Sequence, residues 1–206
     1  AAEMPRLELQ LRGAVVVFKP PAWEVDGRSS QCLEADAGDG RLGLSTFIQQ
    51  LFPRDKYPLP HWPEFDHGFL HRLDIPSSGL ILAGTTFEGY HALRLQLNTY
   101  ALRREYFVAC QGVLLPALEK VSLGIGSTAV RVRRSIADDC GKPAETYVRA
   151  QSQLLWPQPR GLAAARYTTV SIRIRTGRHH QIRTHMLHSS HPTVTDAKYT
   201  VQSLHV

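Results

Sequence analysis

The stretch HRLDIPSSGLILAG, residues 71–84, joins a polar turn to a short apolar run. The run at residues 79–83 is typical of a buried strand, and Pro76 and Gly79 favour a tight turn just before it. Asp74 lies in this turn, at the edge of the predicted sheet, where a side chain can face a cleft. An Asp in a turn also commonly caps the backbone around it. The residues alone therefore leave two interpretations of Asp74, a functional carboxylate and a turn cap.

A second polar segment, TGRHHQIRTH, covers residues 176–185. It follows an alternating strand pattern at residues 169–175, which Gly177 ends, and it leads into a predicted helix at residues 178–188. A glycine that opens a helix leaves backbone amides pointing outward, which favours an anion. The donor side chains of this segment and of the preceding strand are Arg173, Arg175, Arg178, His179, Gln181, Arg183 and His185. They indicate an anion-binding site, and a solvated basic face is the alternative.

Hydrophobic periodicity predicts the other elements. Strands are predicted at residues 14–18, 105–110 and 130–133. Helices are predicted at residues 45–52 with a Ser or Thr cap, at residues 85–98 with a capping box of Thr85 and Glu88, and at residues 178–188 with Ile182 and Met186 facing inward. Residues 23–43 and 53–67 are predicted to be irregular. This mixture predicts an α+β fold, in which a central, mostly antiparallel mixed sheet is flanked by helices and loops.

The composition limits the class of protein. With 206 residues, 43% of them hydrophobic, the chain suits one packed domain and is too apolar to be disordered throughout. Its net charge of +6 favours a polyanionic partner. The three cysteines, Cys32, Cys110 and Cys140, form no CxxC pair, which argues against a disulfide framework and a zinc ribbon and indicates a reducing compartment. The apolar runs are too short to cross a bilayer.

Six segments together resemble the RluA-type RNA pseudouridine synthase family. HRLDIPSSG at residues 71–79 resembles the family's HRLDxxTSG motif, GRHHQIRTH at residues 177–185 resembles GRxHQxRxH, and HPTVTDAKY at residues 191–199 resembles HPxxGDxxYG. Weaker matches are KPP at residues 19–21 to KPxG, REY at residues 104–106 to KxY, and GKPAET at residues 141–146 to GKxAxT. They follow the family's order over nearly the whole chain. This shared order, rather than composition, favours the functional interpretation of both polar segments.

The chain also departs from the family's motifs. Ser77 replaces a threonine and keeps its hydroxyl, and Ala22 stands where a Pro-Gly turn is usual. Thr195 and Thr200 replace two glycines, so the shape of the loop around them is expected to differ from the family's. The family's closing strands do not follow this loop, and the sheet is expected either to be truncated at that edge or to be completed outside this sequence.

The resemblance implies a single pseudouridine synthase catalytic domain over residues 1–206, with no S4-like RNA-binding domain evident. It implies isomerisation of uridine to pseudouridine in a structured loop of rRNA or tRNA, without a cofactor or a metal. The target uridine would be flipped out of the stack. The partner would be RNA rather than a membrane, and the protein would be a monomer in a reducing intracellular compartment, either the cytoplasm or an organelle.

The resemblance also implies roles for individual residues. Asp74 matches the catalytic aspartate, which would act either as a nucleophile on the sugar or base or as a base at the ribose. Arg183 matches the arginine that pairs with it and opposes its neutralisation by burial. Tyr106, which alone would be interpreted as a core residue, matches a tyrosine that stacks on the target base and assists proton transfer. Arg72 matches an arginine that enters the RNA where the uridine has left. Further predicted contacts are Leu73 and Ile182 as an apolar wall, Arg173, Arg175, Arg178 and Lys198 at phosphates, and His179 and Gln181 as donors.

Two other functions are compatible with parts of the sequence. A metal-dependent hydrolase could use the crowded histidines His179, His180, His185, His188 and His191, but the chain has no HExxH pattern. A non-enzymatic RNA-binding module descended from the same fold would need only the basic surface. The joint presence of Asp74, Tyr106 and Arg183 favours the enzyme, because plain binding has no need of that trio.

Overall fold

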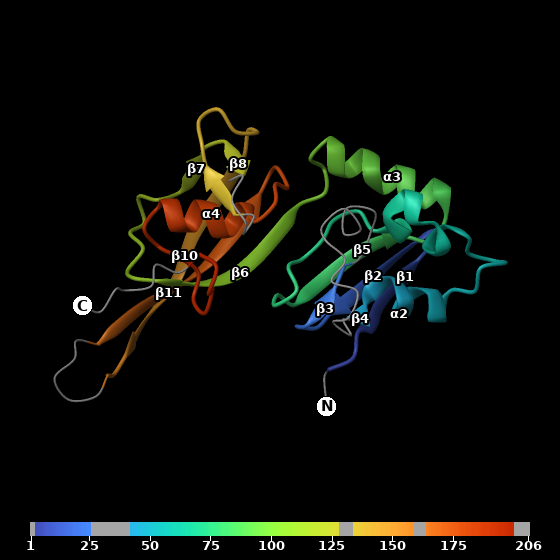
Figure 1. Ribbon diagram of the computed structural model, residues 1–206, viewed down its shortest axis with the longest axis horizontal. Coiled ribbons are helices and arrows are strands. Elements are labelled where there is room, and N and C mark those ends of the chain that lie inside the picture. The colour runs from blue at the N-terminus through green and yellow to red at the C-terminus, as the bar shows by residue number, and fades with distance from the viewer. Residues whose placement is uncertain (1–2, 26–41, 128–133, 159–163, 200–206) are drawn as a thin grey trace. The chain divides into compact units, whose positions relative to one another are not determined.

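The computed structural model of the protein describes residues 3–25, 42–127, 134–158 and 164–199 (Figure 1). The chain divides into two compact units, Ala1–Leu102 and Arg103–Val206, here named unit 1 and unit 2. Each unit has its own main antiparallel sheet. The predicted strand at residues 130–133 and the positions of Cys32 and Thr200 lie outside the described residues.

A three-stranded sheet forms the centre of unit 1. Its strand order is β1 (Arg6–Leu11), β2 (Ala14–Lys19) and β5 (Gly79–Gly84). Because side chains alternate along a strand, one face of β2 and β5 is fully buried, and it consists of Val15, Val17, Ile81 and Ala83. In this register Lys19 is paired with Gly79, so the end of β2 lies beside the segment that carries Asp74.

Helices and short turns complete unit 1. They are α2 (Leu44–Leu51), η1 (Leu59–His61), η2 (Pro63–Gly68) and α3 (Phe87–Asn98), and β3 (Trp23–Glu24) and β4 (Leu42–Gly43) form a short parallel pair. Tyr90 on α3 joins a buried cluster with Leu59 and Leu70, and Leu93 and Leu97 pack against that cluster. The inward face predicted for this helix, and its end at Asn98, are confirmed.

The predicted helix caps need correction. α2 begins without a side-chain cap. α3 is capped by Thr86 rather than Thr85, because the Thr86 hydroxyl accepts the hydrogen bond from the Gly89 amide at 3.1 Å. Thr85 is buried instead. Glu88 does lie in the first turn, where the helix dipole favours a negative charge.

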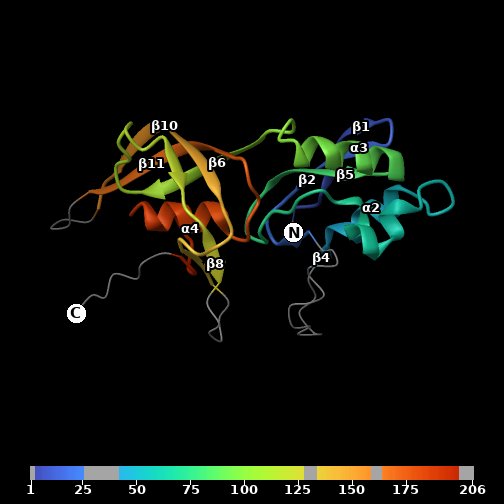
Figure 2. The ribbon, with the colours of Figure 1, turned by 90° about the horizontal axis from the view of Figure 1, so that it is seen from above.

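A four-stranded antiparallel sheet forms the centre of unit 2. Its strand order is β6 (Arg104–Gln111), β11 (Ala165–Ile174), β10 (Glu145–Trp156) and β7 (Lys120–Ser122). Helix α4 (Gln181–His188) packs on one face, and Figure 2 shows no described helix of unit 2 on the other face. Met186 joins Val148 and Ile172 in the core between helix and sheet. The short pair β8 (Ile125–Ser127) and β9 (Ser135–Ala137) lies beside α4.

The α+β class with mostly antiparallel strands is confirmed. Strand β10 is not predicted by periodicity, because a bulge between Ala150 and Ser152 moves the alternation to the other face. The last helix begins at Gln181 rather than at Arg178, and its predicted inward residue Met186 is fully buried.

Candidate active site

The loop that carries Asp74 leads into β5 of unit 1. Asp74 is half-buried beside the buried Leu73, and Arg72 on the other side of Leu73 is exposed. A hydrogen bond of 3.0 Å from the Ser77 amide to the Asp74 carbonyl oxygen closes the turn. Because this bond uses the backbone, it does not depend on the carboxylate. The turn is thus closed by the backbone, and the catalytic role of Asp74 stays a prediction.

Lys19, the last residue of β2, has a fully buried side chain. Its ammonium group donates hydrogen bonds to the carbonyl oxygens of Pro20 at 3.0 Å, Trp23 at 2.7 Å and Ile75 at 3.2 Å. Since Ile75 directly follows Asp74, a buried charge ties the KPP turn to the Asp74 loop. No role was predicted for Lys19 beyond the turn. A lysine that continues a buried strand directly before two prolines is the signal that could have identified it.

The protonation of Lys19 is expected to couple folding to pH. Burial lowers the pKa of Lys19 to about 8, and the negative charge of Asp74 acts in the opposite direction. The unfolded chain keeps an ordinary lysine pKa of 10.5 and so holds this proton more tightly than the folded protein does between the two values. This site should therefore raise the free energy of unfolding as the pH rises from about 8 to about 10.5.

An Asp74→Asn variant gives this prediction a matched comparison. Removing the negative charge should bring the pKa of Lys19 below 8, so the rise in stability should begin at a lower pH than in the wild type. Urea denaturation at a series of pH values between about 7 and 10 measures both curves. Curves of the same shape for the two proteins would show that the charge of Asp74 does not affect the pKa of Lys19.

Two residues that stand where the family has glycine adopt left-handed backbone conformations. The φ angle is 70° at Ala22 and 59° at Thr195. A β-carbon makes this region costly, and most of all for a β-branched residue such as threonine. The Ala22 amide nevertheless keeps a 2.9 Å hydrogen bond to the Ile75 carbonyl oxygen, so the turn is formed at the cost of strain.

We expect Ala22→Gly and Thr195→Gly each to raise the free energy of unfolding by about 0.5–1 kcal/mol. This gain is the backbone strain that glycine relieves in the folded protein, minus the cost of the greater conformational entropy of glycine in the unfolded chain. Urea denaturation measures it, and Thr195→Ala, which keeps a β-carbon, should stabilise less than Thr195→Gly. Glycine variants less stable than the wild type would contradict the assignment of strain.

In unit 2, Arg183 on α4 forms a two-pronged ion pair with Asp196. Nε of Arg183 lies 2.6 Å from one carboxylate oxygen, and Nη2 lies 2.7 Å from the other. The two side chains are only 19% and 8% exposed, respectively. The Thr193 hydroxyl and the backbone amides of Lys198 and Tyr199 also donate to this carboxylate. The bidentate geometry fixes the plane of the guanidinium group.

The electrostatics of Asp196 follow from these contacts. Burial acts to raise the pKa of Asp196, but the hydrogen bonds from Arg183 and Thr193 and the positive charge of Arg183 outweigh it and lower the pKa below its ordinary value. Asp196 is thus an ionised partner of Arg183. It belongs to the HPTVTDAKY segment, and that motif position was the signal that could have marked it as a site residue.

The ring of Tyr199 lies against the same guanidinium group. The guanidinium carbon of Arg183 is 4.6 Å from the ring centroid, a cation–π contact. The Tyr199 hydroxyl bonds to Nδ1 of His180 at 2.7 Å and accepts a hydrogen bond from the Ser135 amide at 2.9 Å. His180 stacks on His179 with ring centroids 3.6 Å apart. Tyr199 therefore links the start of α4 to β9 while it contacts Arg183.

Gln181, predicted to contact substrate, is buried, and its amide group is used within unit 2. Its Oε1 accepts from the Thr176 hydroxyl at 2.9 Å and from the Arg178 amide at 3.0 Å. Its Nε2 donates to the Glu145 carbonyl oxygen at 2.9 Å and to the Thr146 hydroxyl at 3.0 Å. Gln181 is thus a positioning residue for α4. The Arg178 amide is therefore engaged by Gln181, and anion binding at this helix end stays a prediction.

His185 is a second internal anchor of α4. Its ring is fully buried, with Nε2 donating to the Leu123 carbonyl oxygen at 3.0 Å. Nδ1 then accepts from the Thr146 hydroxyl at 2.8 Å. Burial lowers the pKa of His185, in spite of the opposing hydrogen bond to Leu123. The ring is therefore a neutral structural group rather than an anion donor.

The predicted site residues of unit 2 lie on opposite faces of its sheet. Tyr106 and Ile182 pack against the core on the face that α4 covers. Arg173 points away from that face, because its neighbours Ile172 and Ile174 are buried in the core and side chains alternate. The structure does not bring Arg173 to the side of Tyr106. The contact of Arg173 with a phosphate stays a prediction.

The remaining predicted substrate contacts are exposed or half-buried in unit 2: Arg175, Arg178, His179 and Lys198. Arg175 lies 3.6 Å from the Glu145 carboxylate. Nε of Arg178 donates to the Pro143 carbonyl oxygen at 3.0 Å, and Nδ1 of His179 lies 2.9 Å from the Ser135 hydroxyl. The contacts of Arg175, Arg178 and Lys198 with phosphates and the donor role of His179 stay predictions.

The histidine-rich segment gives no support to a metal-dependent hydrolase. In the part of the chain that the structure describes, no three His, Cys, Asp or Glu side chains are placed to hold a metal ion together. The rings of His179, His180 and His185 bond to hydroxyl groups of their own unit.

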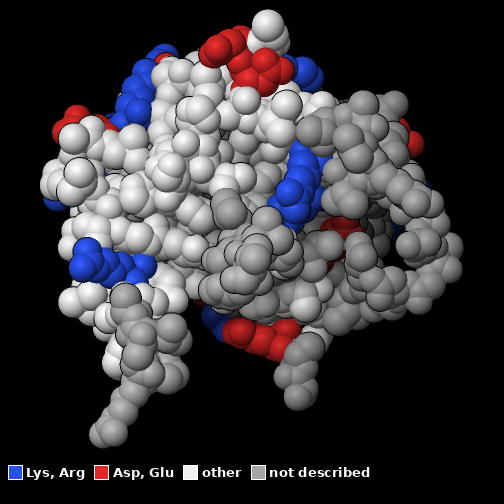
Figure 3. Space-filling view, turned by 60° about the vertical axis from the view of Figure 1, so that its left-hand side comes forward, with Lys and Arg blue, Asp and Glu red and all other residues white. Residues whose placement is uncertain are grey.

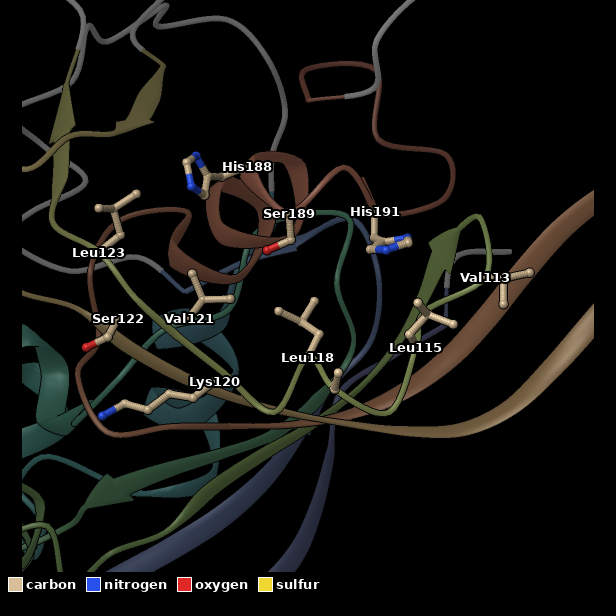
Figure 4. Close-up of a pocket in the computed structure, with 11 residues that line it drawn as sticks. Val113, Leu115, Leu118, Lys120, Val121, Ser122, Leu123, His188, Ser189 and His191 are labelled. Carbon is tan, nitrogen blue, oxygen red and sulfur yellow. The ribbon is translucent and has the colours of Figure 1, made fainter.

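A surface pocket of about 630 Å³ lies beside the C-terminal end of α4 (Figure 4). It is lined mainly by apolar side chains between residues 113 and 123, together with His188, Ser189 and His191. None of Asp74, Tyr106 and Arg183 lines it. The pocket is therefore not the predicted uridine site.

Charge is spread over the surface that Figure 3 draws. Lys and Arg side chains form separate groups there on a mostly uncharged surface, and Asp and Glu side chains lie near some of them. The net charge of +6 is thus not gathered into one basic patch in this view. On this face, phosphate binding would depend on individual cations rather than on a broad positive field.

Residues 15–188 match the sequence profile of a family described as RNA pseudouridylate synthase. The chain belongs to this family. The match extends from β2 of unit 1 to the end of α4 in unit 2, so it includes the segments that carry Asp74, Tyr106 and Arg183. The resemblance to the RluA type of pseudouridine synthase is confirmed.

Curated relatives bear pseudouridine synthase names. Ribosomal large subunit pseudouridine synthase C of Buchnera aphidicola subsp. Schizaphis graminum (strain Sg) is 28% identical over 165 residues, which are 79% of this chain and 46% of that protein. Ribosomal large subunit pseudouridine synthase D of Neisseria meningitidis serogroup B (strain ATCC BAA-335 / MC58) is 30% identical over 146 residues, 68% of this chain and 36% of the relative. tRNA pseudouridine synthase C of Salmonella typhi is 30% identical over 131 residues, 63% of this chain and 50% of the relative. The aligned part of this chain spans half or less of each of these relatives.

Two solved structures share the fold of this chain. Human RNA Pseudouridylate Synthase Domain Containing 1 has a TM-score of 0.71 and 19% identity, and the match covers 98% of this chain and 72% of that one. Human RNA Pseudouridylate Synthase Domain Containing 4 has a TM-score of 0.64 and 16% identity, with coverage of 95% and 69%. Within the described residues, the chain has no helix of the length and apolarity that a membrane crossing requires.

Proposed function

We propose that this chain converts specific uridines in structured rRNA or tRNA to pseudouridine, without a cofactor. The observation that carries the proposal is the placement of Asp74 on a turn that the buried Lys19 ammonium ties down, at the motif position of the family's catalytic aspartate. An RNA-binding module would have no use for a positioned carboxylate, which repels phosphate. The names of relatives that refer to ribosomal and transfer RNA support these two substrate classes.

The proposed reaction is an isomerisation. The N1–C1′ bond breaks, the uracil turns, and C5 forms a bond to C1′. The hydrogen at C5 leaves as a proton and N1 takes one up, so atoms and electrons balance without a co-reactant. Asp74 would attack the sugar or base, or remove a proton from the ribose, and each route requires an ionised carboxylate.

Arg183 is proposed to hold the Asp74 carboxylate in its ionised form and in a fixed orientation. Asp196 binds Nε and Nη2 of Arg183 and so fixes the plane of the guanidinium group, as this role requires. This role requires units 1 and 2 to be two halves of one catalytic domain over residues 1–206. The family match, which extends over both units, supports that organisation.

The proposed substrate contacts follow from the need to extract a base from the RNA. Flipping a uridine costs a few kcal/mol and is easiest in a loop. Tyr106 would stack on the flipped base between the apolar side chains of Leu73 and Ile182, and Arg72 would occupy the vacated place in the RNA. The exposed Arg178 and the half-buried Lys198 would neutralise backbone phosphates.

We further propose a monomer that works in a reducing intracellular compartment, either the cytoplasm or an organelle. Cys110 and Cys140 are both free thiols. Cys110 is buried and Cys140 is exposed, an arrangement that suits an environment in which thiols stay reduced.

Pseudouridine mapping of cellular RNA, with and without the gene for this protein, tests the proposed function. We expect specific pseudouridines in rRNA or tRNA to disappear when the protein is absent and to return with the wild-type chain but not with Asp74→Asn. Wild-type protein that binds RNA tightly while the pseudouridine maps stay identical would favour the non-enzymatic alternative.

A further inference from the structure

Helix α4 covers one face of the unit 2 sheet (Figure 2). The other face carries aromatic and basic side chains on adjacent strands. The register places Phe107, Ser171 and Arg149 in one cross-strand row. The next row consists of Glu105, Arg173, Tyr147 and Lys120. Beyond the bulge in β10, Tyr167 and Trp156 continue the same face. We call this surface the open face and define it by Phe107, Tyr147, Arg149, Trp156, Tyr167 and Arg173.

The open face is unusual because two of its aromatic residues are solvent-exposed, whereas Tyr147 and Tyr167 are half-buried. Phe107 is 79% exposed and Trp156 is 57% exposed. The outer face of an antiparallel sheet that is packed on one side normally carries polar residues. Large apolar side chains gathered on such a face mark an interaction site.

Cations surround the aromatic residues of the open face. The guanidinium carbon of Arg173 is 4.9 Å from the Tyr147 ring centroid, and Nζ of Lys120 is 5.3 Å from it. Arg149 is exposed in the same row as Phe107. The basic side chains Lys120, Arg149, Arg173 and Arg175 outnumber the acidic side chains Glu105 and Glu145 along these strands. The face therefore combines π surfaces with a net positive charge.

Its geometry leaves room for a nucleotide. Phe107 and Arg149 are separated by one intervening strand, hence by about 10 Å. The residue between them is the small Ser171, so no bulky side chain fills the space. A base stacked on Phe107 would keep its phosphate within reach of a long basic side chain.

We propose that the open face is an accessory binding surface for single-stranded RNA. Bases stack on the exposed ring of Phe107, and Arg149 and Arg173 neutralise phosphates. Exposed aromatic side chains on a four-stranded sheet are a sequence-tolerant platform for bases, and nearby arginines supply the electrostatic attraction. The inference rests on the proposed function, since the RNA would be a segment that flanks the target loop. It also gives Arg173 a role on the face where the structure places it.

Charge favours RNA over a protein partner for this surface. A polyanion complements the net positive face, and stacking uses the aromatic rings without requiring a matched apolar surface. The core of a protein interface would instead tend to be depleted of lysine and glutamate, both of which lie in the row of Tyr147.

The test compares RNA affinities of two matched double variants. The probe is a fluorescein-labelled oligouridylate of about 12 nucleotides, whose binding is followed by fluorescence anisotropy. Phe107→Ser with Arg149→Gln should weaken binding by about 10-fold or more and make the salt dependence shallower, by about 0.7 in the slope of log K against log salt. Leu95→Ser with Arg54→Gln removes a 65% exposed leucine and an exposed arginine from unit 1 and should bind like the wild type.

A second measurement does not depend on the double variant being well folded. Phe107→Trp keeps a stacking ring and places a fluorophore on the open face. The oligouridylate should quench its added emission at the same concentrations that raise the anisotropy. No quenching at saturating RNA would overturn the proposal.

Failure of the inference and failure of the proposed function give different results. Equal RNA affinities for the open-face variant and the wild type would overturn the inference and indicate a protein partner for this surface, while wild-type pseudouridine formation would be untouched. A different result would overturn the proposed function and uphold the accessory surface: the wild-type chain makes no pseudouridine, and the open-face variant binds RNA more weakly than the wild type does.

Discussion

Asp74→Asn is expected to lower the rate of pseudouridine formation by more than about 10³-fold, with little change in RNA affinity. Asparagine has nearly the same shape as aspartate but neither attacks carbon nor accepts the proton as a carboxylate does. The turn should stay folded, because it is closed by the backbone of Asp74 and held by Lys19 through the Ile75 carbonyl oxygen. The loss should therefore be chemical rather than structural.

Single-turnover kinetics with excess enzyme, read by mass spectrometry of digested RNA, measure this effect. Asp66→Asn is the matched control, since Asp66 is also a half-buried aspartate of unit 1 and lies outside the family motifs. It should react at close to the wild-type rate. An Asp74→Asn variant that retains more than about a tenth of the wild-type rate would remove Asp74 from the chemistry.

The second large effect is expected from the ion pair between Arg183 and Asp196. Asp196→Asn leaves a mostly buried guanidinium without its counter-charge, and we expect the free energy of unfolding to fall by about 2–3 kcal/mol. The same variant should lower kcat by about 10²-fold, because Arg183 loses the partner that sets its plane. Arg183→Lys should lose comparable activity, since an ammonium group cannot pair in a bidentate manner.

The pH dependence of stability distinguishes this mechanism from a general loss of packing. Because the pKa of Asp196 is lowered in the folded state, its contribution is present above the ordinary carboxyl pKa and is lost as the pH falls through the folded-state value. Wild type and Asp196→Asn should therefore differ most near neutral pH and converge in acid. Urea denaturation at about pH 7 and about pH 3 measures the difference.

An exposed ion pair supplies the control. Glu3 and Arg6 are 2.9 Å apart, but both side chains are more than half exposed. Glu3→Gln should leave stability unchanged at both pH values, because water and salt screen such a pair. A constant difference between wild type and Asp196→Asn at all pH values would mean that the lost stability is not electrostatic.

Much of the fold could be predicted from local patterns, because apolar residues recur at a characteristic spacing in a strand and in a helix. β2, β5 and α3 follow directly from their apolar spacing. The bulge in β10 could not be read, since it depends on how that strand pairs with β11. The cap of α3 shifted from Thr85 to Thr86 because tertiary packing buries Thr85.

Some roles of the site residues could likewise be predicted from the sequence, and others could not. The motifs identified Asp74 and Arg183, because the chemistry requires those residue types in that order. They gave Gln181 a substrate role, although its amide group is used by contacts from Thr176, Arg178, Glu145 and Thr146, which only the folded unit brings together. They also left Lys19 and Asp196 without roles. The three carbonyl contacts of Lys19 are a product of tertiary structure, and their local sign is a lysine that continues a buried strand directly before two prolines.

Tritium release is the most direct test of the proposed activity. RNA labelled with tritium at C5 of uridine loses one tritium to water for each pseudouridine formed, because C5 exchanges its hydrogen for the bond to C1′. We predict that the purified wild-type chain releases tritium from rRNA or tRNA of cells that lack the protein, and that Asp74→Asn releases none. Labelled RNA that the wild-type chain binds, but from which it releases no tritium, would show that the chain is not a pseudouridine synthase.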